Sequence, residues 1–353
     1  MGLLFFVSLV AFIISVSLTP VLRALAMRHD ITAKPNHRTI HRKPIPLLGG
    51  ISIFIAFVAG IVLVMTFGSN IYSKLVHENF AFVSGGLVIL LLGIYDDIRG
   101  ANAYQKFLAQ IVAAVLVVAL GYQIRTIILP FGAPIHLGWL SIPLTILWLV
   151  MMSNAFNLID GLDGLASGVA LGVSLTMMTI SLWNGNLISA VPAGILAGAL
   201  AGFLIFNFNP ARIFLGDSGS LVIGFWLACF SINGTFRTSS AIAILVPIII
   251  FSLPILDTSI AFLRRISKGM HPFKADKKHL HHRLLYLGLS QRQAMLILTG
   301  VSCFWGMMAF FIVALDNRYS LLIATFVLFT IYFGIRSLIP GKLFVIRSSK
   351  TNS

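Results

Sequence analysis

The chain has 353 residues, of which 58% are hydrophobic and 10% are charged, with a formal net charge of +15 and a mean hydropathy of +0.98. This composition excludes an ordinary soluble domain. Apolar segments of about 20 residues, the length that crosses roughly 30 Å of hydrocarbon, recur along the whole chain. The basic residues are scattered between these segments and form no basic domain, which argues against a nucleic-acid partner.

The apolar segments predict an all-α, polytopic integral membrane protein with about 11 transmembrane helices. With the N-terminus outside, only Lys74, Arg125, Arg237 and Arg318 of the 25 lysines and arginines fall in outer segments. This asymmetry predicts a cytoplasmic C-terminus, because short inner loops carry the positive charge. The first segment has no basic n-region and is therefore expected to be a span, not a signal peptide. The expected spans lie near residues 2–22, 47–67, 80–95, 107–121, 139–156, 168–183, 187–206, 218–232, 241–262, 293–314 and 320–340.

These spans are expected to form one membrane domain, residues 1–340, followed by a basic cytoplasmic tail, residues 341–353. Cys229 and Cys303 each stand alone within an apolar segment, so we expect free thiols and no disulfide. The cytoplasmic loops expected to carry polar chemistry are residues 23–46, 96–106, 157–167, 207–217 and 264–292.

Five acidic residues occur in three short stretches, and each stretch adjoins an apolar span. GIYDDIRG contains Asp96 and Asp97, NLIDGLDGLASG contains Asp160 and Asp163, and IFLGDSGS contains Asp217. A single acid at a helix start is an ordinary cap. Two adjacent acids at the end of a span instead oppose the helix dipole. We therefore expect a cation to bring these carboxylates together.

The residues around these acids suggest a phosphate site. Asp160 and Asp163 are three apart and share one face if the helix continues through them. The hydroxyls of Ser218 and Ser220 suit a helix start whose free N–H groups bind phosphate. Carboxylates beside a phosphate site predict a divalent metal between them, Mg²⁺ with Mn²⁺ as the alternative.

The long inner loop, residues 264–292, contains three clustered histidines and eight basic residues. His279 and His282 are spaced to share a helix face, whereas His281 points elsewhere. Contact with a multiply charged anionic substrate explains these histidines. Attraction of a basic loop to anionic lipid head groups and a zinc site are the alternatives.

Asp257 is expected within the ninth span, toward its inner end. An ionisable side chain at such a place is costly and is a functional candidate by default. A structural carboxylate bonded to the hydroxyl of Thr258 or Ser259 is the alternative.

The motifs from HRKPIPLLGG, near residue 41, to HLHHRL, ending at residue 284, resemble a known family in order and spacing. This family is the polyprenyl-phosphate N-acetylhexosamine-1-phosphate transferases, which include the MraY, WecA and TagO enzymes. The resemblance implies a helical bundle with a cleft open to the cytoplasm and a lipid groove between spans. It also implies a Mg²⁺-dependent attack of a lipid phosphate on the sugar-bearing phosphate of a UDP-sugar, which releases UMP.

The resemblance also implies roles for the acidic residues. Asp217 is similar to the principal metal ligand, and Asn157 is similar to a second metal ligand. Asp96 and Asp97 resemble an essential acidic pair, for which base and nucleophile roles have been proposed. A phosphate monoester is already mostly dianionic at neutral pH, so direct attack by the lipid phosphate is favoured. Asp160 would orient nearby polar groups or the water shell of the metal.

The same resemblance implies a nucleotide pocket. Phe214 resembles an aromatic residue that stacks on uracil, and Asp163, Gly216 and Asn207 match positions that line the pocket. Lys106 resembles a basic residue near the acidic pair and would hold the lipid phosphate, with snorkelling to the interface as the alternative. The other residues expected near the nucleotide or sugar are Arg42, Lys43, His279, His281, His282 and Arg283.

The interrupted histidine run His279-Leu280-His281-His282 resembles the WecA/TagO branch, whereas MraY enzymes have three successive histidines. This favours UDP-N-acetylglucosamine as donor and undecaprenyl phosphate as acceptor, at the first step of a cell-envelope glycan in the bacterial cytoplasmic membrane. UDP-MurNAc-pentapeptide and other UDP-N-acetylhexosamines are the alternatives within this class. A secondary transporter of an anionic solute is the alternative from another class of protein. Such a transporter would place ionisable groups near the midplane and show internal repeats, whereas this sequence shows no repeat and places its acidic motifs at the inner ends of spans. Monomer and homodimer both stay open.

Overall fold

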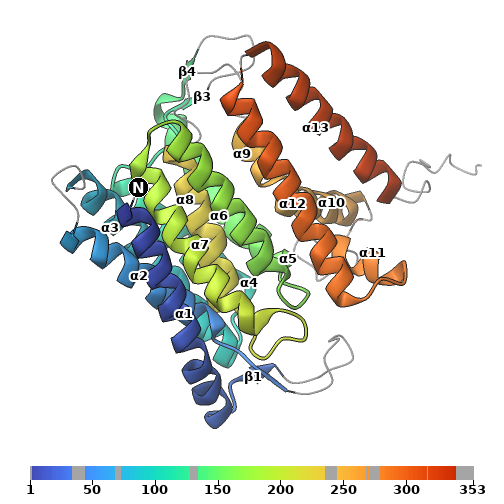
Figure 1. Ribbon diagram of the computed structural model, residues 1–353. Coiled ribbons are helices and arrows are strands. Elements are labelled where there is room, and N and C mark those ends of the chain that lie inside the picture. Colours follow the sequence, from blue (N-terminus) through green and yellow to red (C-terminus); the bar gives the residue numbers. More distant parts are fainter. Residues whose placement is uncertain are drawn as a thin grey trace, which may run out of the picture.

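The computed structural model describes residues 2–33, 44–67, 73–127, 134–234, 245–267, 269, 279–315 and 317–338. Helices dominate this part of the chain, and two short antiparallel strand pairs join some of them (Figure 1). The helices are α1 (Gly2–Arg28), α2 (Gly49–Phe67), α3 (Ser73–Arg99), α4 (Ala103–Ala119), α5 (Ser141–Ile159), α6 (Leu165–Trp183), α7 (Leu187–Asn207), α8 (Asp217–Gly234), α9 (Leu245–Ile250), α10 (Ser252–Ser267), α11 (Leu280–Tyr286), α12 (Gln291–Ala314) and α13 (Asn317–Leu338), with a 3₁₀ turn at Gly138–Leu140. The strands are β1 (Thr32–Ala33), β2 (Ile45–Pro46), β3 (Thr126–Ile127) and β4 (Ile135–His136).

Seven helices in the described residues are long and apolar enough to cross a membrane. Three shorter apolar helices, at Ala103–Ala119, Asp217–Ile232 and Tyr319–Phe333, lie among them. The prediction of a polytopic helical membrane protein is confirmed at this level.

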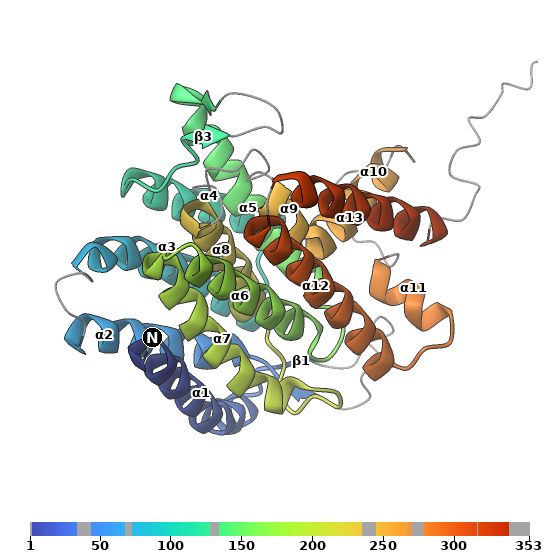
Figure 2. The same cartoon turned by 45° about the horizontal axis from the view of Figure 1, so that its top comes forward.

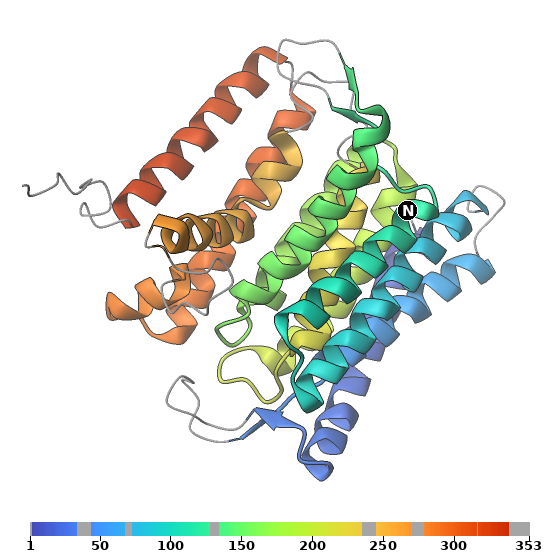
Figure 3. The same ribbon diagram turned by 180° about the vertical axis from the view of Figure 1, so that it is seen from behind.

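The ninth expected span, residues 241–262, differs from the expectation because the described part of it is broken into α9 and α10. Pro254 has no N–H to donate to the carbonyl four residues earlier, which favours an interruption before it. The chain turns at Phe251, and α10 then runs across α12 instead of continuing along α9 (Figure 3). This break carries Asp257 away from the axis of α9.

Helix α8 lies inside the bundle and packs against α2, α3, α5, α6 and α7 (Figure 2). A helix that is apolar on all sides is expected in such a place. Its Trp226 is fully buried, and the indole Nε1 donates a hydrogen bond of 2.8 Å to the carbonyl of Phe82 on α3. The ring of Phe57 on α2 lies 4.1 Å from the indole, centroid to centroid. The middle of α8 is thus fixed from two sides.

The first turn of α8 is held by close backbone packing. A Cβ atom on Gly93 of α3 would lie 2.4 Å from the Cα of Ser218, and a Cβ on Gly50 of α2 would lie 2.2 Å from the backbone nitrogen of Gly219. No residue with a side chain fits at either place without movement. Helices α2 and α3 therefore lie directly against the backbone that begins at Asp217, and this contact fixes where that residue stands.

Gly93→Ala is expected to destabilise the protein, because overpacking a tight contact costs about 1–3 kcal/mol. Gly300→Ala on α12 is the matched control, since nothing lies within 4 Å of its added Cβ. Thermal unfolding of the detergent-solubilised protein should show a lower midpoint for Gly93→Ala only. Equal midpoints in the two variants would contradict this account of the α3–α8 contact.

Candidate active site

A cavity of about 920 Å³ opens at the end of the bundle where α5 ends and α8 begins. Strand β1, the turn between α5 and α6, and the loop after α7 lie together at this end, at the bottom of Figures 1 and 3. The cavity is therefore bounded by loops from distant parts of the sequence. The expected site residues that line it are Asp97, Asn157, Asp160, Asp163, Asn207, Phe214, Gly216, Asp217 and His282.

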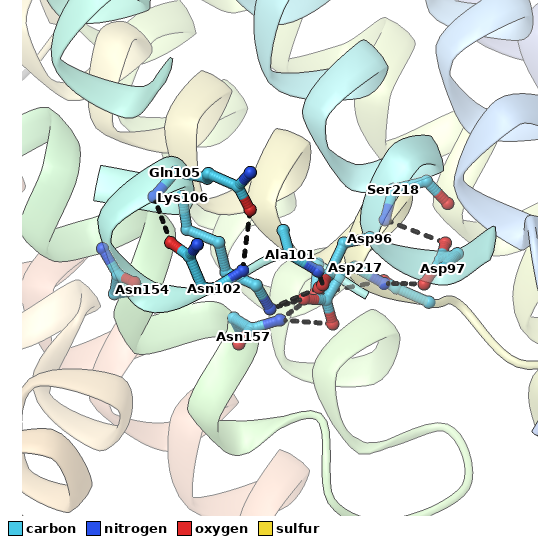
Figure 4. Close-up of polar contacts among 12 residues, drawn as sticks. Asp96, Asp97, Ala101, Asn102, Gln105, Lys106, Asn154, Asn157, Asp217 and Ser218 are labelled. Atoms are coloured by element: carbon cyan, nitrogen blue, oxygen red, sulfur yellow. Dashed lines mark hydrogen bonds and ion pairs between the residues drawn. The ribbon is translucent and has the colours of Figure 1, made fainter. Parts of the chain in front are cut away.

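Lys106 brings two of the acidic residues together (Figure 4). Its ammonium nitrogen lies 2.6 Å from Oδ2 of Asp217 and also forms an ion pair with Asp96. The other carboxylate oxygen of Asp96 accepts a 2.5 Å hydrogen bond from the backbone N–H of Ala101. A lysine thus joins Asp96 to Asp217, and it reaches them from the first turn of α4.

Asp97 binds the start of α8. Its Oδ1 accepts a 2.8 Å hydrogen bond from the backbone N–H of Asp217, and its Oδ2 accepts a 3.2 Å hydrogen bond from that of Ser218. The expectation that these N–H groups are free for phosphate is wrong, because an internal carboxylate uses them. Gly216 precedes the helix with a φ of +73°, and a Cβ there would lie 2.5 Å from Oδ2 of Asp97. Glycine is required by both its backbone and its surroundings.

Asn157 reaches Asp217 from the last turn of α5. Its amide nitrogen donates to Oδ1 of Asp217 at 2.9 Å and to the hydroxyl of Ser220 at 3.0 Å. The two carboxylate oxygens of Asp217 therefore face different partners, Asn157 on one side and Lys106 on the other (Figure 4).

The donor set fits a magnesium ion that is only partly held by protein. Within the described part of the chain, no three His, Cys, Asp or Glu side chains form a complete ligand set. The carboxylates of Asp96 and Asp217 nevertheless both bind the ammonium group of Lys106, and the side-chain amide of Asn157 lies beside Asp217. Mg²⁺ usually takes one or two carboxylates and completes its shell with phosphate and water. Carboxylate oxygens beside a cavity that admits phosphate and water fit this kind of coordination.

Asp163 ties two loops together. Because α5 ends at Ile159, the helix does not continue through Asp160 and Asp163, and the two residues lie in the turn that follows it. Oδ2 of Asp163 accepts 2.9 Å hydrogen bonds from the side chain of Asn209 and from the backbone N–H of Ala211. The carboxylate thereby holds the loop after α7 against the turn after α5.

Asp160 lies in a strongly negative environment. Burial of its carboxyl group raises its pKa well above the ordinary value, and the charges of Asp217, Asp97 and Asp163 raise it further. Each cause disfavours the ionised form. The protonation of Asp160 therefore depends on the charge that these three neighbours carry.

Two further expected residues shape the cavity wall. Asn207 is buried; its amide oxygen accepts a 2.6 Å hydrogen bond from the hydroxyl of Ser167, and its amide nitrogen donates at 3.0 Å to the carbonyl of Ile213. Phe214 is held by its backbone, since its N–H donates to the carbonyl of Pro46 at 2.8 Å. Asn207 thus positions the loop that contains Phe214.

The histidines form a layered cluster. His282 lines the cavity, whereas His279 and His281 are buried and Arg283 is half-buried outside the cavity lining. Burial, followed by the neighbouring His282, lowers the pKa of His281 to about 4, so this ring is neutral at pH 7. The expectation that His279 and His282 share one face is wrong, because His279 precedes the helix and its ring stacks on His281.

Two arginines at the cavity were not singled out from the sequence. Arg23 from α1 and Arg212 from the loop after α7 both line it, and Nε of Arg23 donates to the carbonyl of Arg212 at 3.1 Å. Both were included only in the overall charge asymmetry. Their positions in the sequence could have identified them as candidates, because Arg23 directly follows the first expected span and Arg212 lies five residues before Asp217. Arg42 and Lys43 lie outside the described residues.

Comparison with known proteins gives a family and several relatives of this chain. Residues 79–235 match the family described as glycosyl transferase family 4. A relative from Bacillus subtilis, called a probable undecaprenyl-phosphate N-acetylglucosaminyl 1-phosphate transferase, is 37% identical over 82% of this chain and 80% of its own length. A decaprenyl-phosphate N-acetylglucosaminephosphotransferase from Mycolicibacterium smegmatis is 36% identical over 83% of this chain and 78% of its own.

A third relative, an undecaprenyl-phosphate alpha-N-acetylglucosaminyl 1-phosphate transferase from Yersinia pestis, is 27% identical over 82% of this chain and 78% of its own length. The chain is in the class of helical membrane bundles with a cluster of acidic residues at one end. Within that class, the chain belongs to the family of polyprenyl-phosphate N-acetylglucosamine-1-phosphate transferases. Its bacterial relatives and membrane-length helices make it a multi-pass bacterial membrane protein.

Gly216→Ala is expected to be more damaging than Gly185→Ala. Both glycines have a positive φ, +73° and +67°, and a left-handed conformation costs a residue with a side chain roughly 1–2 kcal/mol. Only the Cβ at residue 216 would meet another group, the carboxylate of Asp97, whereas nothing lies within 4 Å at residue 185. Thermal unfolding should therefore show the larger drop in midpoint temperature for Gly216→Ala. Similar drops in the two variants would contradict the close contact between residue 216 and Asp97.

Proposed function

We propose that the chain transfers N-acetylglucosamine-1-phosphate from UDP-N-acetylglucosamine to undecaprenyl phosphate. The products are undecaprenyl-diphospho-N-acetylglucosamine and UMP. One observation carries the proposal: Asp96, Asp97, Asp217, Asn157 and Lys106 meet at one end of an apolar bundle, beside a cavity of about 920 Å³. The names of the relatives support the same donor sugar and a polyprenyl phosphate acceptor.

The reaction forms one P–O bond and breaks another. An oxygen of the lipid phosphate attacks the sugar-bearing phosphorus of the donor, and UMP leaves with the bonding electrons of the bridging P–O bond. Such a transfer needs aligned reactants and neutralised charge more than it needs covalent chemistry by the protein. Lys106 supplies one positive charge at the centre of the acids and is suited to hold the acceptor phosphate.

Mg²⁺ is the cofactor that these residues suit, with Mn²⁺ as the alternative. Asp217 would be the principal ligand and Asn157 a second ligand, with Asp96 beside them. When bound, the ion supplies charge neutralisation at the phosphates. Oxygen donors beside a cavity, with positions left for phosphate and water, support this assignment.

The hydrogen bonds of Asp97 support direct attack by the lipid phosphate. Both of its carboxylate oxygens accept from the backbone of α8, so the group serves to hold that helix start. The acceptor needs no base, since a phosphate monoester with a second pKa near 6 is mostly dianionic at neutral pH. Asp97 is therefore assigned to positioning Asp217.

The donor is assigned to the wall of the cavity formed by the loop after α7. Phe214 offers an aromatic face for uracil, and Asp163 holds the loops on which that wall depends. Arg23 and Arg212 add positive charge at the same cavity, which suits a nucleotide diphosphate. The active site is assigned to the cytoplasmic face, and the excess of basic residues in the loops at this face supports the assignment.

Another UDP-N-acetylhexosamine is the alternative donor, since the cavity residues named above are assigned to uridine and phosphate and none of them is assigned to the sugar. A panel of UDP-sugars distinguishes these donors. Purified protein with Mg²⁺, undecaprenyl phosphate and UDP-N-acetylglucosamine should release UMP at the highest rate in the panel. No UMP from any UDP-N-acetylhexosamine would refute the proposed function.

Asp217→Asn is expected to abolish transfer while leaving the protein folded, because the substitution removes a charge at almost constant volume. The matched control is Asp30→Asn, an exposed acid in the turn after α1, outside the cavity. UMP release should fall by at least about a hundredfold, the size typical for loss of a group that stabilises transferred charge. Robust turnover by Asp217→Asn in Mg²⁺ would refute the metal assignment.

A further inference from the structure

Asp257 is a buried carboxylate that the proposed reaction does not use. It lies on α10 with 3% of its surface exposed. Its Oδ2 is 2.9 Å from Nδ1 of His279, and its Oδ1 accepts a 2.8 Å hydrogen bond from the backbone N–H of Leu280. These partners differ from the hydroxyls of Thr258 and Ser259, which the structural alternative had assigned to this carboxylate. The side chain of Asp257 on α10 therefore binds both the imidazole ring of His279 and the first backbone N–H of α11.

The bonds to Asp257 determine how the His279 ring is oriented. A carboxylate oxygen of Asp257 lies against Nδ1 of His279, so this ring nitrogen is held at a fixed place beside α10. A second group that fixes the orientation of a histidine is a common feature of functional sites. A buried carboxyl group without hydrogen-bond partners is costly, so the contacts with His279 and Leu280 also stabilise Asp257 in its place.

The histidine rings connect Asp257 to the cavity. His279 stacks on His281 with ring centroids 5.8 Å apart and planes 6° apart, and His281 lies 4.3 Å from His282, centroid to centroid. His281 also packs closely against the turn after α5, because a Cβ atom on Gly161 would lie 2.3 Å from the Nε2 atom of His281. His282 then lines the cavity. The series of contacts begins at Asp257 and ends where the donor is proposed to bind.

Helix α11 needs such support, because it has seven residues and a helix this short is not stable alone. Leu280 and Leu284 pack against the core on one side. Asp257 supplies the polar attachment at the N-terminal end, next to the histidines. Apolar packing holds the helix near α12, whereas the carboxylate sets its rotation at the cavity end.

We infer that Asp257 is a positioning residue for donor binding: through His279 and the start of α11 it holds His282 toward the anionic UDP-sugar. The inference rests on the proposed function, in which this cavity binds that donor. Asp257 acts through the histidines, since it is not among the residues that line the cavity.

Asp257→Ala and Asp257→Asn in the full-length protein test this inference. Asp257→Ala should raise the KM for UDP-N-acetylglucosamine by about tenfold, the scale expected for loss of a hydrogen bond to a charged group. The KM for undecaprenyl phosphate should change by less than about twofold by the same reasoning, because the acceptor is assigned to Lys106. Asp257→Asn should fall between, since its amide oxygen still accepts from Leu280.

Two further variants separate positioning from folding. Ser252→Ala on the same helix removes a buried hydroxyl that donates a hydrogen bond to the carbonyl of Ile249, and it should leave both KM values unchanged. Combining Asp257→Ala with His279→Ala should raise the donor KM no further than either change alone, because the two residues act through one contact. Equal rises in both KM values, or additive effects of the two changes, would overturn the inference.

Histidine modification by diethyl pyrocarbonate, read by mass spectrometry, gives a measurement that does not depend on turnover. His279 is 6% exposed and should be protected in the wild type but modified faster in Asp257→Ala. Unchanged protection would overturn the positioning role. If the wild type releases no UMP, the proposed function fails, and faster modification would still show that Asp257 holds the histidine cluster.

Discussion

The clamp between Asp97 and the first turn of α8 is the constraint on which the rest of the site depends. Two backbone N–H groups donate to this carboxylate, and Gly93 and Gly50 allow α3 and α2 to touch the same turn. Asp217 then stands within reach of α4 and α5, so Lys106 and Asn157 bind its two carboxylate oxygens. Moving this turn would separate the charged groups from one another and from the cavity.

The site is arranged to tolerate much negative charge. Asp96, Asp97, Asp160, Asp163 and Asp217 gather at one end of the bundle, and each except Asp160 has a hydrogen bond or ion pair described above. Asp160 instead has a raised pKa from burial and from its neighbours. A site that already holds these acids needs added positive charge before anionic substrates enter, and this requirement is the physical reason for proposing a divalent metal there.

The sequence predicted a good part of this arrangement. Long apolar segments located the helices, and the three acidic stretches located Asp96, Asp97 and Asp217 at one end of the bundle. The expected span at 139–156 and the expected loop at 157–167 agree with the end of α5 at Ile159, whereas a shared helix face for Asp160 and Asp163 would have required a longer helix. The sequence did not predict the partner of Asp257, since His279 follows 22 residues later and only the break between α9 and α10 brings them together.

The membrane class, the helices and the types of residue available for chemistry follow from the sequence alone, because they depend on apolar length and on local composition. Which of these groups meet depends on how the helices pack. A lysine from α4 joins acids from α3 and α8, the N–H groups of α8 bind Asp97, and a carboxylate on α10 orients the histidines. The physical reason is that hydrogen bonds and ion pairs act over about 3 Å, whereas the residues that make them lie tens of positions apart in the chain.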